Sequence, residues 1–543
     1  MKSQITSRPN LTKIFIFVLL FASFGVVSAI AGDAPEISTL SPSQMAALAS
    51  GPAPSLAYIA PAPPLSDMAR NLLSGAGRTA LYGKWRDNTD TLSQLMTSQS
   101  EGASKTNAIV GQVAKLIKTL PTVNNRAFDT TFAFTESETS VAQPLKNDIV
   151  VGYNSSADFA HGSGFSGFAY SVNNGKSFTE VAGGLPDFGP VTPLGDPSLV
   201  SDGQGNVFYS TLAQNLSTGA SYVAVYKSTD GGQSFTAYSA AGGGNSYFLD
   251  KPLMAIDTNP ASPNYGNLYF TFTYFSSGIT SPIYVCHITV NNPNGSCIPI
   301  VNEAASGAMP AIDANGNLYV AWEQFTTGGG ANSIDALYFS KSTDGGATFS
   351  TPAPITNVSP IFDSGVSQFT CGRQAIKGAI RVQDFPSIAI DTGAKSKNKG
   401  SIYVAWNDQR NGDPDIFITK STNGGSSWST PAIVNKNGVG TDQFFPWVSV
   451  LPSGKVGVTY YDRSRDQNNW YVDFDLATSL NGGTTWAQSF LTTRPFPVVV
   501  NTDPIIATCY MSDYNQITNN GVNLLMAWGD NSNGDPDVRF IKK

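Results

Sequence analysis

The chain has 543 residues, of which 13% are charged and 41% hydrophobic, and it contains 52 glycines and 33 prolines. This turn-rich and aromatic-rich composition indicates a globular protein that favours many short strands over long helices. The formal net charge is −7 and no basic block offsets it, which argues against a nucleic-acid-binding function.

The first 31 residues have the pattern of an export signal. Lys2, Arg8 and Lys13 precede the apolar run 14–29, which ends in small residues suited to signal peptidase. Because the run is nearly long enough to span a bilayer, an uncleaved membrane anchor is the alternative. We therefore predict a secreted, cell-surface or periplasmic protein with no membrane contact beyond this signal.

The residues after the signal fall into three segments. Residues 32–64 are rich in Pro, Ala and Ser, which predicts a linker. In two stretches of residues 65–127, apolar residues recur at three and four positions, so we predict a short helical extension. From about Phe128 the apolar period becomes two, as is typical of strands, and this pattern continues over residues 128–543.

Four cysteines in an exported chain predict disulfides, for which three pairings are possible. Cys286 and Cys297 flank a predicted hairpin, so their pairing is the simplest assignment. Cys371 and Cys509 would then tie a long loop to the last part of the chain. Free buried thiols are the alternative. With only two histidines and no Cys–His pattern, a zinc or multi-histidine metal site is not expected.

One turn sequence is repeated along the strand-rich segment. Its Asp or Asn can bond backbone groups of its own turn, its glycines supply positive φ, and its final Phe or Trp can pack between sheets. The turn is therefore a structural element, one hairpin per repeat, and it is no catalytic signal. The five copies are SVNNGKSF (171–178), STDGGQSF (228–235), STDGGATF (342–349), STNGGSSW (421–428) and SLNGGTTW (479–486).

A second pattern lies upstream of most of these turns. It consists of an acidic residue, often a proline, alternating apolar residues, a turn and an aromatic-rich strand, as in MPAIDANGNLYVAWEQF (309–325). Four short strands in roughly 50 residues is the period of a propeller blade, and such sheets must stack around an axis to bury both faces. We count seven units, with six as the alternative. They start near Glu138, Asp196, Asp250, Met309, Asp384, Phe444 and Asp503.

The last unit stops before its repeated turn and outer strand. We predict that residues 128–134 supply the missing strand and close the ring, because closure removes exposed sheet edges. The sequence thus predicts an all-β, seven-bladed propeller of four-stranded antiparallel blades.

The repeated turn, S-x-D-x-G-x-[ST]-[FW], resembles the Asp-box, or bacterial neuraminidase repeat, of the sialidase-like superfamily. Sialidases, other glycoside hydrolases and sortilin-type receptors carry it, and the resemblance spans about residues 128–543. It implies a propeller whose ligands bind at the axial mouth, on the face where loops enter the inner strands. A sialidase would also have three arginines, a Tyr–Glu pair and an acidic proton donor. The early Arg-Ile-Pro type motif is absent here, and Arg126, followed by Ala-Phe, is a poor substitute.

Acidic residues precede the predicted inner strands repeatedly and would cluster around this mouth. Paired carboxylates on either side of a sugar are what most glycosidases need. The alternative is that each aspartate caps its own turn, and that the tryptophans of the second strands, Trp322, Trp406 and Trp528, fill blade interiors instead of stacking on sugars. The candidate catalytic residues are Asp250, Asp384, Asp408, Asp462, Tyr461, Arg463 and Arg410.

Two segments, 405–417 and 527–540, share the pattern W-x-D-x-x-N-G-D-P-D. Carboxylate and amide oxygens at such short intervals could hold Ca²⁺, although N-G-D-P is also a good tight turn. No other cofactor is expected. The candidate calcium ligands are Asp408, Asp413, Asp530 and Asp535.

Together these patterns predict an exported, sialidase-like propeller that binds or processes extracellular glycans. Two alternatives stay open. One is an active exo-glycosidase, of sialidase type or another glycoside hydrolase, that uses carboxylates at the axial mouth. The other is a surface or adhesion propeller whose partner is a protein. The missing arginine motif favours binding over catalysis.

Overall fold

The computed structural model is nearly all β in the residues it describes, with two helices there, α1 (Pro42–Ala49) and α5 (Ser156–Ala160). The predicted export signal and most of the predicted helical extension lie outside these residues. No helix among them is long and apolar enough to cross a membrane. The described residues are 34–52, 60–66, 69, 73–74, 77–78, 81, 120–131, 133–325, 335–361, 371, 374–436 and 440–543.

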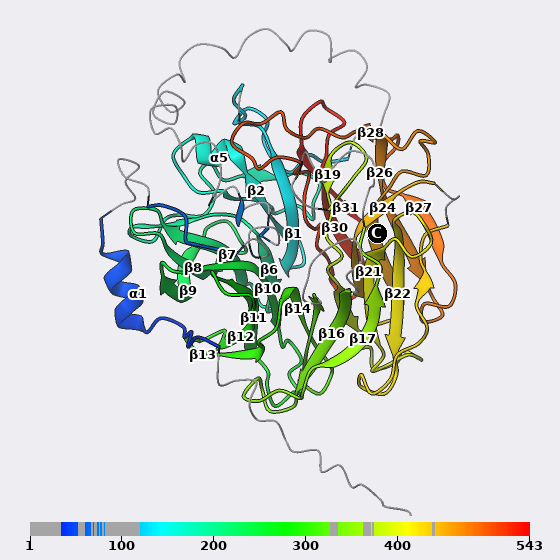
Figure 1. Ribbon diagram of the computed structural model, residues 1–543, viewed down its shortest axis with the longest axis horizontal. Coiled ribbons are helices and arrows are strands. Elements are labelled where there is room, and N and C mark those ends of the chain that lie inside the picture. Colours follow the sequence, from blue (N-terminus) through cyan, green and yellow to red (C-terminus); the bar gives the residue numbers. More distant parts are fainter. Residues whose placement is uncertain are drawn as a thin grey trace, which may run out of the picture.

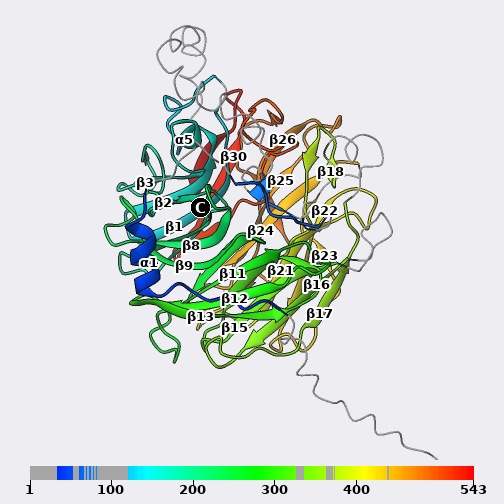
Figure 2. The ribbon, with the colours of Figure 1, turned by 60° about the vertical axis from the view of Figure 1, so that its left-hand side comes forward.

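Seven antiparallel sheets stand around a common axis (Figure 1, Figure 2). The predicted seven-bladed propeller is therefore confirmed, and the six-bladed alternative is wrong. In each blade the strands follow one another outward in chain order, because short hairpins join antiparallel neighbours. A small extra hairpin, β18 (Ala375–Ile376) and β19 (Ile380–Arg381), follows the fourth blade and precedes the fifth in the chain.

The first four blades run from inner to outer strand as follows. The first is β1 (Glu136–Leu145), β2 (Asp148–Ser155), β3 (Ser166–Ser171) and β4 (Thr179–Glu180). The second is β6 (Ser198–Ser201), β7 (Val207–Asn215), β8 (Ala220–Ser228) and β9 (Thr236–Gly244), with β5 (Val191–Pro193) also paired to β7. The third is β10 (Phe248–Ile256), β11 (Asn267–Phe275), β12 (Ile283–Thr289) and β13 (Asn292–Val301). The fourth is β14 (Ala305–Ile312), β15 (Leu318–Gln324), β16 (Asp335–Ser342) and β17 (Ala353–Val358).

The remaining blades follow the same plan. The fifth is β20 (Ser387–Ile390), β21 (Ile402–Asp408), β22 (Asp415–Ser421) and β23 (Ala432–Ile433). The sixth is β24 (Gln443–Val450), β25 (Val456–Asp462), β26 (Tyr471–Ser479) and β27 (Ala487–Phe490), with β28 (Phe496–Pro497) also paired to β26. The seventh has β29 (Ile517–Asn519), β30 (Leu524–Asp530) and β31 (Asp537–Lys542).

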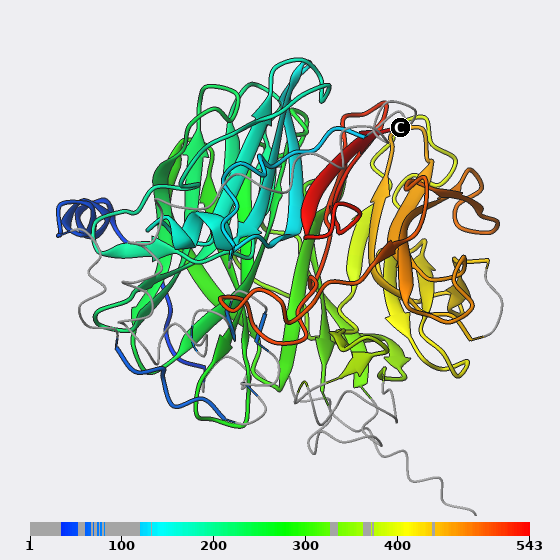
Figure 3. The ribbon, with the colours of Figure 1, turned by 90° about the horizontal axis from the view of Figure 1, so that it is seen from above.

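Residues 121–124 complete the seventh blade and close the ring. Thr122 pairs with Arg539 on β31, and the Val123 amide donates to the Val538 carbonyl at 2.8 Å. The first and seventh blades consequently lie side by side (Figure 3). The prediction that residues 128–134 close the ring was wrong, because that stretch turns back on itself, with the Thr130 amide donating to the Ala133 carbonyl at 2.8 Å.

Inner strands start with a β-bulge in at least four blades. Pairing is shifted between Ser137 and Ser140 in β1, and at the equivalent places in β10, β14 and β24. The bulge residue has positive φ even where it is not glycine, for example 50° at Glu138 and 58° at Lys251. Such backbone is strained for a residue with a Cβ and tends to occur at functional sites.

Neighbouring blades are joined by hydrogen bonds next to these bulges. Ser140 Oγ accepts from the amide of Leu199 in the next blade at 2.8 Å. Ser198 and Ser387 make equivalent bonds to the third and sixth blades. The serine hydroxyl thus accepts from a backbone amide of the next blade that has no strand partner within its own blade.

The five repeated turns share one set of hydrogen bonds. In the second blade, Ser228 Oγ donates to Asp230 Oδ1 at 2.7 Å and accepts from the Gly232 amide at 2.8 Å. Gly232 has φ 91°, and a Cβ there would lie 1.9 Å from Val150 in the first blade. The turn therefore packs against the preceding blade, which agrees with the structural role expected for it.

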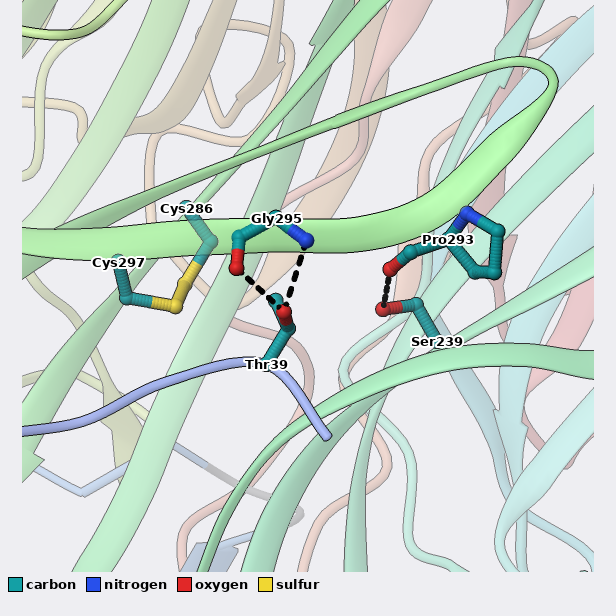
Figure 4. The surroundings of a disulfide bond; sticks show 6 residues. All are labelled: Thr39, Ser239, Cys286, Pro293, Gly295 and Cys297. Atoms are coloured by element: carbon teal, nitrogen blue, oxygen red, sulfur yellow. Dashed lines mark hydrogen bonds between the residues drawn. A yellow bond between two sulfur atoms is a disulfide. The ribbon is translucent and has the colours of Figure 1, made fainter. Parts of the chain in front are cut away.

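Both predicted disulfides are present. Cys286 and Cys297 face each other across β12 and β13, and Cys371 is bonded to Cys509. The first of these lies beside an N-terminal strap, residues 34–41, that crosses the outer strands of the second and third blades (Figure 4). In this strap Thr39 forms a β-bridge with Ala241, and its hydroxyl donates to the Gly295 carbonyl at 2.7 Å.

We expect Asn124→Ala to weaken ring closure. The Asn124 amide donates at 3.0 Å to the buried carboxyl groups of Glu136 and Asp537, and its oxygen accepts from the Val538 amide at 2.9 Å. Each buried polar group left without a partner costs about 1–3 kcal/mol, so the free energy of unfolding should fall by roughly 3 kcal/mol. Chemical denaturation measures it, with exposed Asn294→Ala as the control; equal stabilities of the two variants would contradict this account.

Candidate functional site

Charged side chains from the bulge of β10, from the β18–β19 hairpin and from the segment before β29 meet at the axis. Lys251 Nζ lies 3.4 Å from Asp513 Oδ2, and Arg381 makes a two-pronged contact with the same carboxylate, at 2.7–3.0 Å. These side chains are almost completely buried. Next to these side chains is a cavity of about 30 Å³, which is lined in part by Lys251, Phe385, Trp447 and Asp513.

A pair of acidic side chains, Glu138 and Asp196, lies in the same group. Asn154 donates to Glu138 Oε2 at 3.0 Å and accepts from the Asp196 amide at 2.8 Å, but no donor of the described chain reaches Glu138 Oε1 or either carboxyl oxygen of Asp196. Burial, and then the charge of Asp513, raise the pKa of Glu138 to about 7. Burial and the neighbouring Glu138 raise the pKa of Asp196 well above its usual range. The two groups therefore share a proton at neutral pH.

N-terminal residues cover this mouth of the propeller. Ser74 donates its amide to Asp250 Oδ2 at 2.6 Å and its hydroxyl to Asp250 Oδ1 at 2.7 Å. Leu65, Ala69, Leu73 and Leu81 are buried in one apolar cluster with blade residues that include Phe248 and Phe275. We call the described residues between 60 and 81 the cover.

The candidate catalytic residues of the fifth blade are also held by protein partners. Asp384 Oδ1 accepts from Asn407 at 2.6 Å, and burial followed by the charge of Asp408 raises the pKa of Asp384 well above its usual range. Asp408 accepts from Trp406 Nε1 at 3.0 Å and forms an ion pair with Arg410. The structure thus brings Asp384, Asp408 and Arg410 together.

The sixth-blade candidates form a separate group. Asp462 accepts from Gln443 at 3.0 Å and from the Ser464 amide at 2.8 Å. Tyr461 is buried and donates to the Gly529 carbonyl at 2.8 Å. Arg463 is buried against Asp442, at 3.0 Å. A catalytic role for any of the seven residues stays a prediction.

The tryptophans considered as sugar platforms lie inside blades. Trp322, Trp406 and Trp528 are fully buried in β15, β21 and β30. Trp406 stacks on Phe417, and Trp528 stacks on Phe474. These side chains therefore fill blade interiors.

The candidate calcium ligands lie in two separate turns. Asp408 and Asp413 belong to the β21–β22 connection of the fifth blade, and Asp530 and Asp535 to the β30–β31 connection of the seventh. Asp535 forms an ion pair with Arg126 at 2.6 Å. Among the described residues, no group of three or more His, Cys, Asp or Glu side chains is arranged to hold a metal ion. Calcium binding stays a prediction.

The opposite end of the axis is a cavity of about 920 Å³. All seven inner strands and the turns that follow them line this cavity. Its opening therefore lies on the face where turns join the first and second strands of the blades. Three charged side chains reach it, Lys146, Asp202 and Lys542. Its wall includes a ring of short or branched side chains, one from each blade: Ala142, Val200, Ala255, Ala311, Ala389, Ser449 and Thr518.

The sequence did not lead us to predict that Glu138 and Asp196 form a pair that shares a proton, or that one end of the axis is an open cavity. Glu138 and Asp196 were noted among the acidic residues before inner strands but were not among the candidate catalytic residues. The short or branched residue that each inner strand contributes to this ring was visible in the sequence, but its place around the axis depends on the register of all seven blades.

No family model and no curated relative matches this chain. Among solved structures, it is similar to an α-L-arabinofuranosidase from Fusarium graminearum with an iminosugar inhibitor, at 10% identity and TM-score 0.41, over 78% of this chain and 96% of the other. It is also similar to an α-L-arabinanase from Penicillium chrysogenum with arabinobiose, at 11% identity and TM-score 0.38, over 76% and 97% of the two chains. A third is an ulvan lyase, at 12% identity and TM-score 0.36, over 62% and 78%. All three act on glycans by name, and at this similarity we take nothing from them about the activity of this chain.

Stability should fall as the pH rises through neutrality. A carboxyl group whose pKa is raised on folding contributes stability that is fully present below its unfolded pKa and is lost as the pH rises through its folded pKa. For Glu138, with a folded pKa of about 7, that window runs from about pH 4.5 to 7 and is worth on the order of 3 kcal/mol. Glu138→Gln should therefore flatten the decline of melting temperature between pH 5 and 8.

Other buried carboxyl groups also have raised pKa values, for example Asp129 and Asp475 at about 8, so some decline will remain in this variant. Glu303→Gln, at an exposed position, is the control and should keep the slope of the unmodified chain. A Glu138→Gln slope equal to that of the control would rule out the shared proton.

Proposed function

We propose that this protein is an exported propeller of the sialidase-like superfamily that binds a neutral oligosaccharide at the open end of its axial channel, without hydrolysing it. The observation that supports this most is the chemistry of the open cavity of about 920 Å³, which is nearly free of charge in a chain of net charge −7.

Amides, hydroxyls and apolar surface make up most of its lining. Gln143, Gln516, Thr518 and Asn519 offer donors and acceptors, and Trp447 contributes an aromatic side chain to the wall. Sugars present hydroxyl groups around a ring with apolar C–H faces, which such a lining matches. Neutral side chains also avoid the cost of stripping water from charges when a ligand binds.

The lining favours a neutral sugar over sialic acid. Recognition of a sugar carboxylate calls for cations, above all the two-pronged contact of arginine. No arginine lines the described cavity, and its two lysines are Lys146, in the turn between β1 and β2, and Lys542, the last residue of β31. The buried arginines Arg381 and Arg463 are already paired with Asp513 and Asp442.

Export is part of the proposal. Two disulfides are typical of proteins that fold outside the reducing cytosol, and the N-terminal sequence has the pattern of an export signal. The repeated turns, with their Asp or Asn, glycine pair and aromatic, support placement in the superfamily.

Hydrolysis is the second candidate, because the mouth gathers carboxyl groups with raised pKa values, which is common at catalytic sites. Binding is favoured over it because the cover and the partners described above engage the candidate carboxylates. A panel of chromogenic glycosides tests for turnover. If any substrate is cleaved, Asp384→Asn should abolish cleavage while leaving the melting temperature unchanged within a few degrees.

Ala311→Trp tests the binding proposal. Ala311 lies on the channel wall, so an indole there should obstruct the cavity and reduce binding on a glycan array by at least tenfold. The matched control is Ala432→Trp, on an exposed outer strand of the fifth blade, which should bind like the unmodified chain. Equal glycan binding by both variants would remove the channel as the site, and absence of any glycan ligand would overturn the proposal.

A further inference from the structure

The contact between Ser74 and Asp250 differs from the rest of the cover. The described contacts of the cover with the blades include apolar packing through Leu65, Ala69, Leu73 and Leu81 and backbone hydrogen bonds from Ala60 to Leu216 and from Ser66 to Ser276. At Ser74, by contrast, two donors of one residue meet the two oxygens of one buried carboxylate, at 2.6 and 2.7 Å. The Gly77 amide donates to Ser74 Oγ at 2.8 Å and so orients the hydroxyl towards Asp250.

Asp250 belongs to the charged group at the axis. It precedes Lys251, whose ammonium group contacts Asp513, and its own charge helps to raise the pKa of Asp196. In the same charged group, and apart from the proton that Glu138 and Asp196 share, no described residue supplies a hydrogen-bond partner for the buried atoms Glu138 Oε1, Asp196 Oδ1 and Oδ2, and Arg381 Nη1.

A cap that served stability alone would not need these groups. Buried ion pairs and carboxyl pairs are generally no more stabilising than apolar side chains of similar size, and buried polar atoms without partners destabilise a fold. The mouth nevertheless keeps such groups on strained backbone at Glu138 and Asp196, where φ is 50° and 56°. Violations of this kind are concentrated at sites that bind ligands.

We propose that the cover is autoinhibitory: Ser74 occupies, from within the chain, a site that Asp250 and the Glu138–Asp196 pair form for a hydroxylated ligand. A vicinal diol offers the same pattern, because its two adjacent hydroxyl groups can donate to both oxygens of one carboxylate. Release of the cover leaves Asp250 without these two donors, so that a ligand can take their place next to the carboxyl pair.

This site is distinct from the open channel of the proposed function. It lies at the other end of the axis, it is acidic where the channel is neutral, and Ala311 lines the channel, not the mouth. An experiment can therefore support one proposal and contradict the other.

The test uses the full chain with Leu73→Asp, which places a charge in the buried apolar contact of the cover. A synthetic peptide of residues 60–81 is the probe, and its binding is measured by fluorescence anisotropy. We expect no binding to the unmodified chain, whose mouth is filled, and saturable binding to Leu73→Asp. A peptide with Ser74→Ala should bind the variant about tenfold or more weakly, because a hydrogen bond to a charged group is lost.

Leu480→Asp is the matched control, since it makes the same substitution at an exposed position in the turn between β26 and β27, away from the lining of both cavities. It should not bind the peptide. In a second variant, Ser74→Ala in the full chain, hydrogen exchange of the cover should accelerate about tenfold while the melting temperature of the propeller stays within a few degrees.

Three results would overturn the proposal. Failure of Leu73→Asp to fold would mean that the cover is part of the core. Equal affinity of the two peptides would mean that Ser74 recognises nothing at Asp250. Unchanged exchange of the cover in Ser74→Ala would show the same. Conversely, a glycan that binds Leu73→Asp alone, and still binds after Ala311→Trp is added, belongs to the mouth and not to the channel.

Discussion

The rest of the structure depends on closure of the ring. A four-stranded blade has two apolar faces, and each is buried only if a neighbour stands on both sides. Residues 121–124 meet this constraint by pairing with β31, the last strand of the chain. The seven blades must be held at fixed angles around one axis. Only then can the bulges meet, the serine hydroxyls hydrogen-bond to neighbouring blades and the axial cavities form.

The closed ring gives the axis two ends of opposite chemistry. Where the inner strands begin, the side chains of Glu138, Asp196 and Lys251 lie close together. The charged groups there are paired, protonated or buried under the cover. Where inner strands end, small side chains leave an open cavity that is almost uncharged. The two ends therefore offer a ligand different partners, buried carboxyl groups at one and neutral amides, hydroxyls and apolar side chains at the other.

The number and order of blades could be predicted from the sequence, because each hairpin repeats a turn whose hydrogen bonds are local, as at Ser228 and Asp230. Cys286 and Cys297 were predicted for the same reason, since they flank one hairpin. The closing strand was misplaced because residues 128–134 alternate like a strand, and only distant partners select residues 121–124 instead. The partners of Asp250 were out of reach too: Ser74 lies 176 positions away, and nothing near either residue indicates the other.

The cover also has a consequence for the order of assembly. Ser74 and its apolar neighbours precede every blade in the sequence, yet their binding surface is made of the first three blades and of Ile505, which lies close to the end of the chain. Segments so distant in sequence meet late, because a long loop must close before their contacts can form. The surface on which the cover packs is therefore complete only after the residues around Ile505 have joined the first three blades.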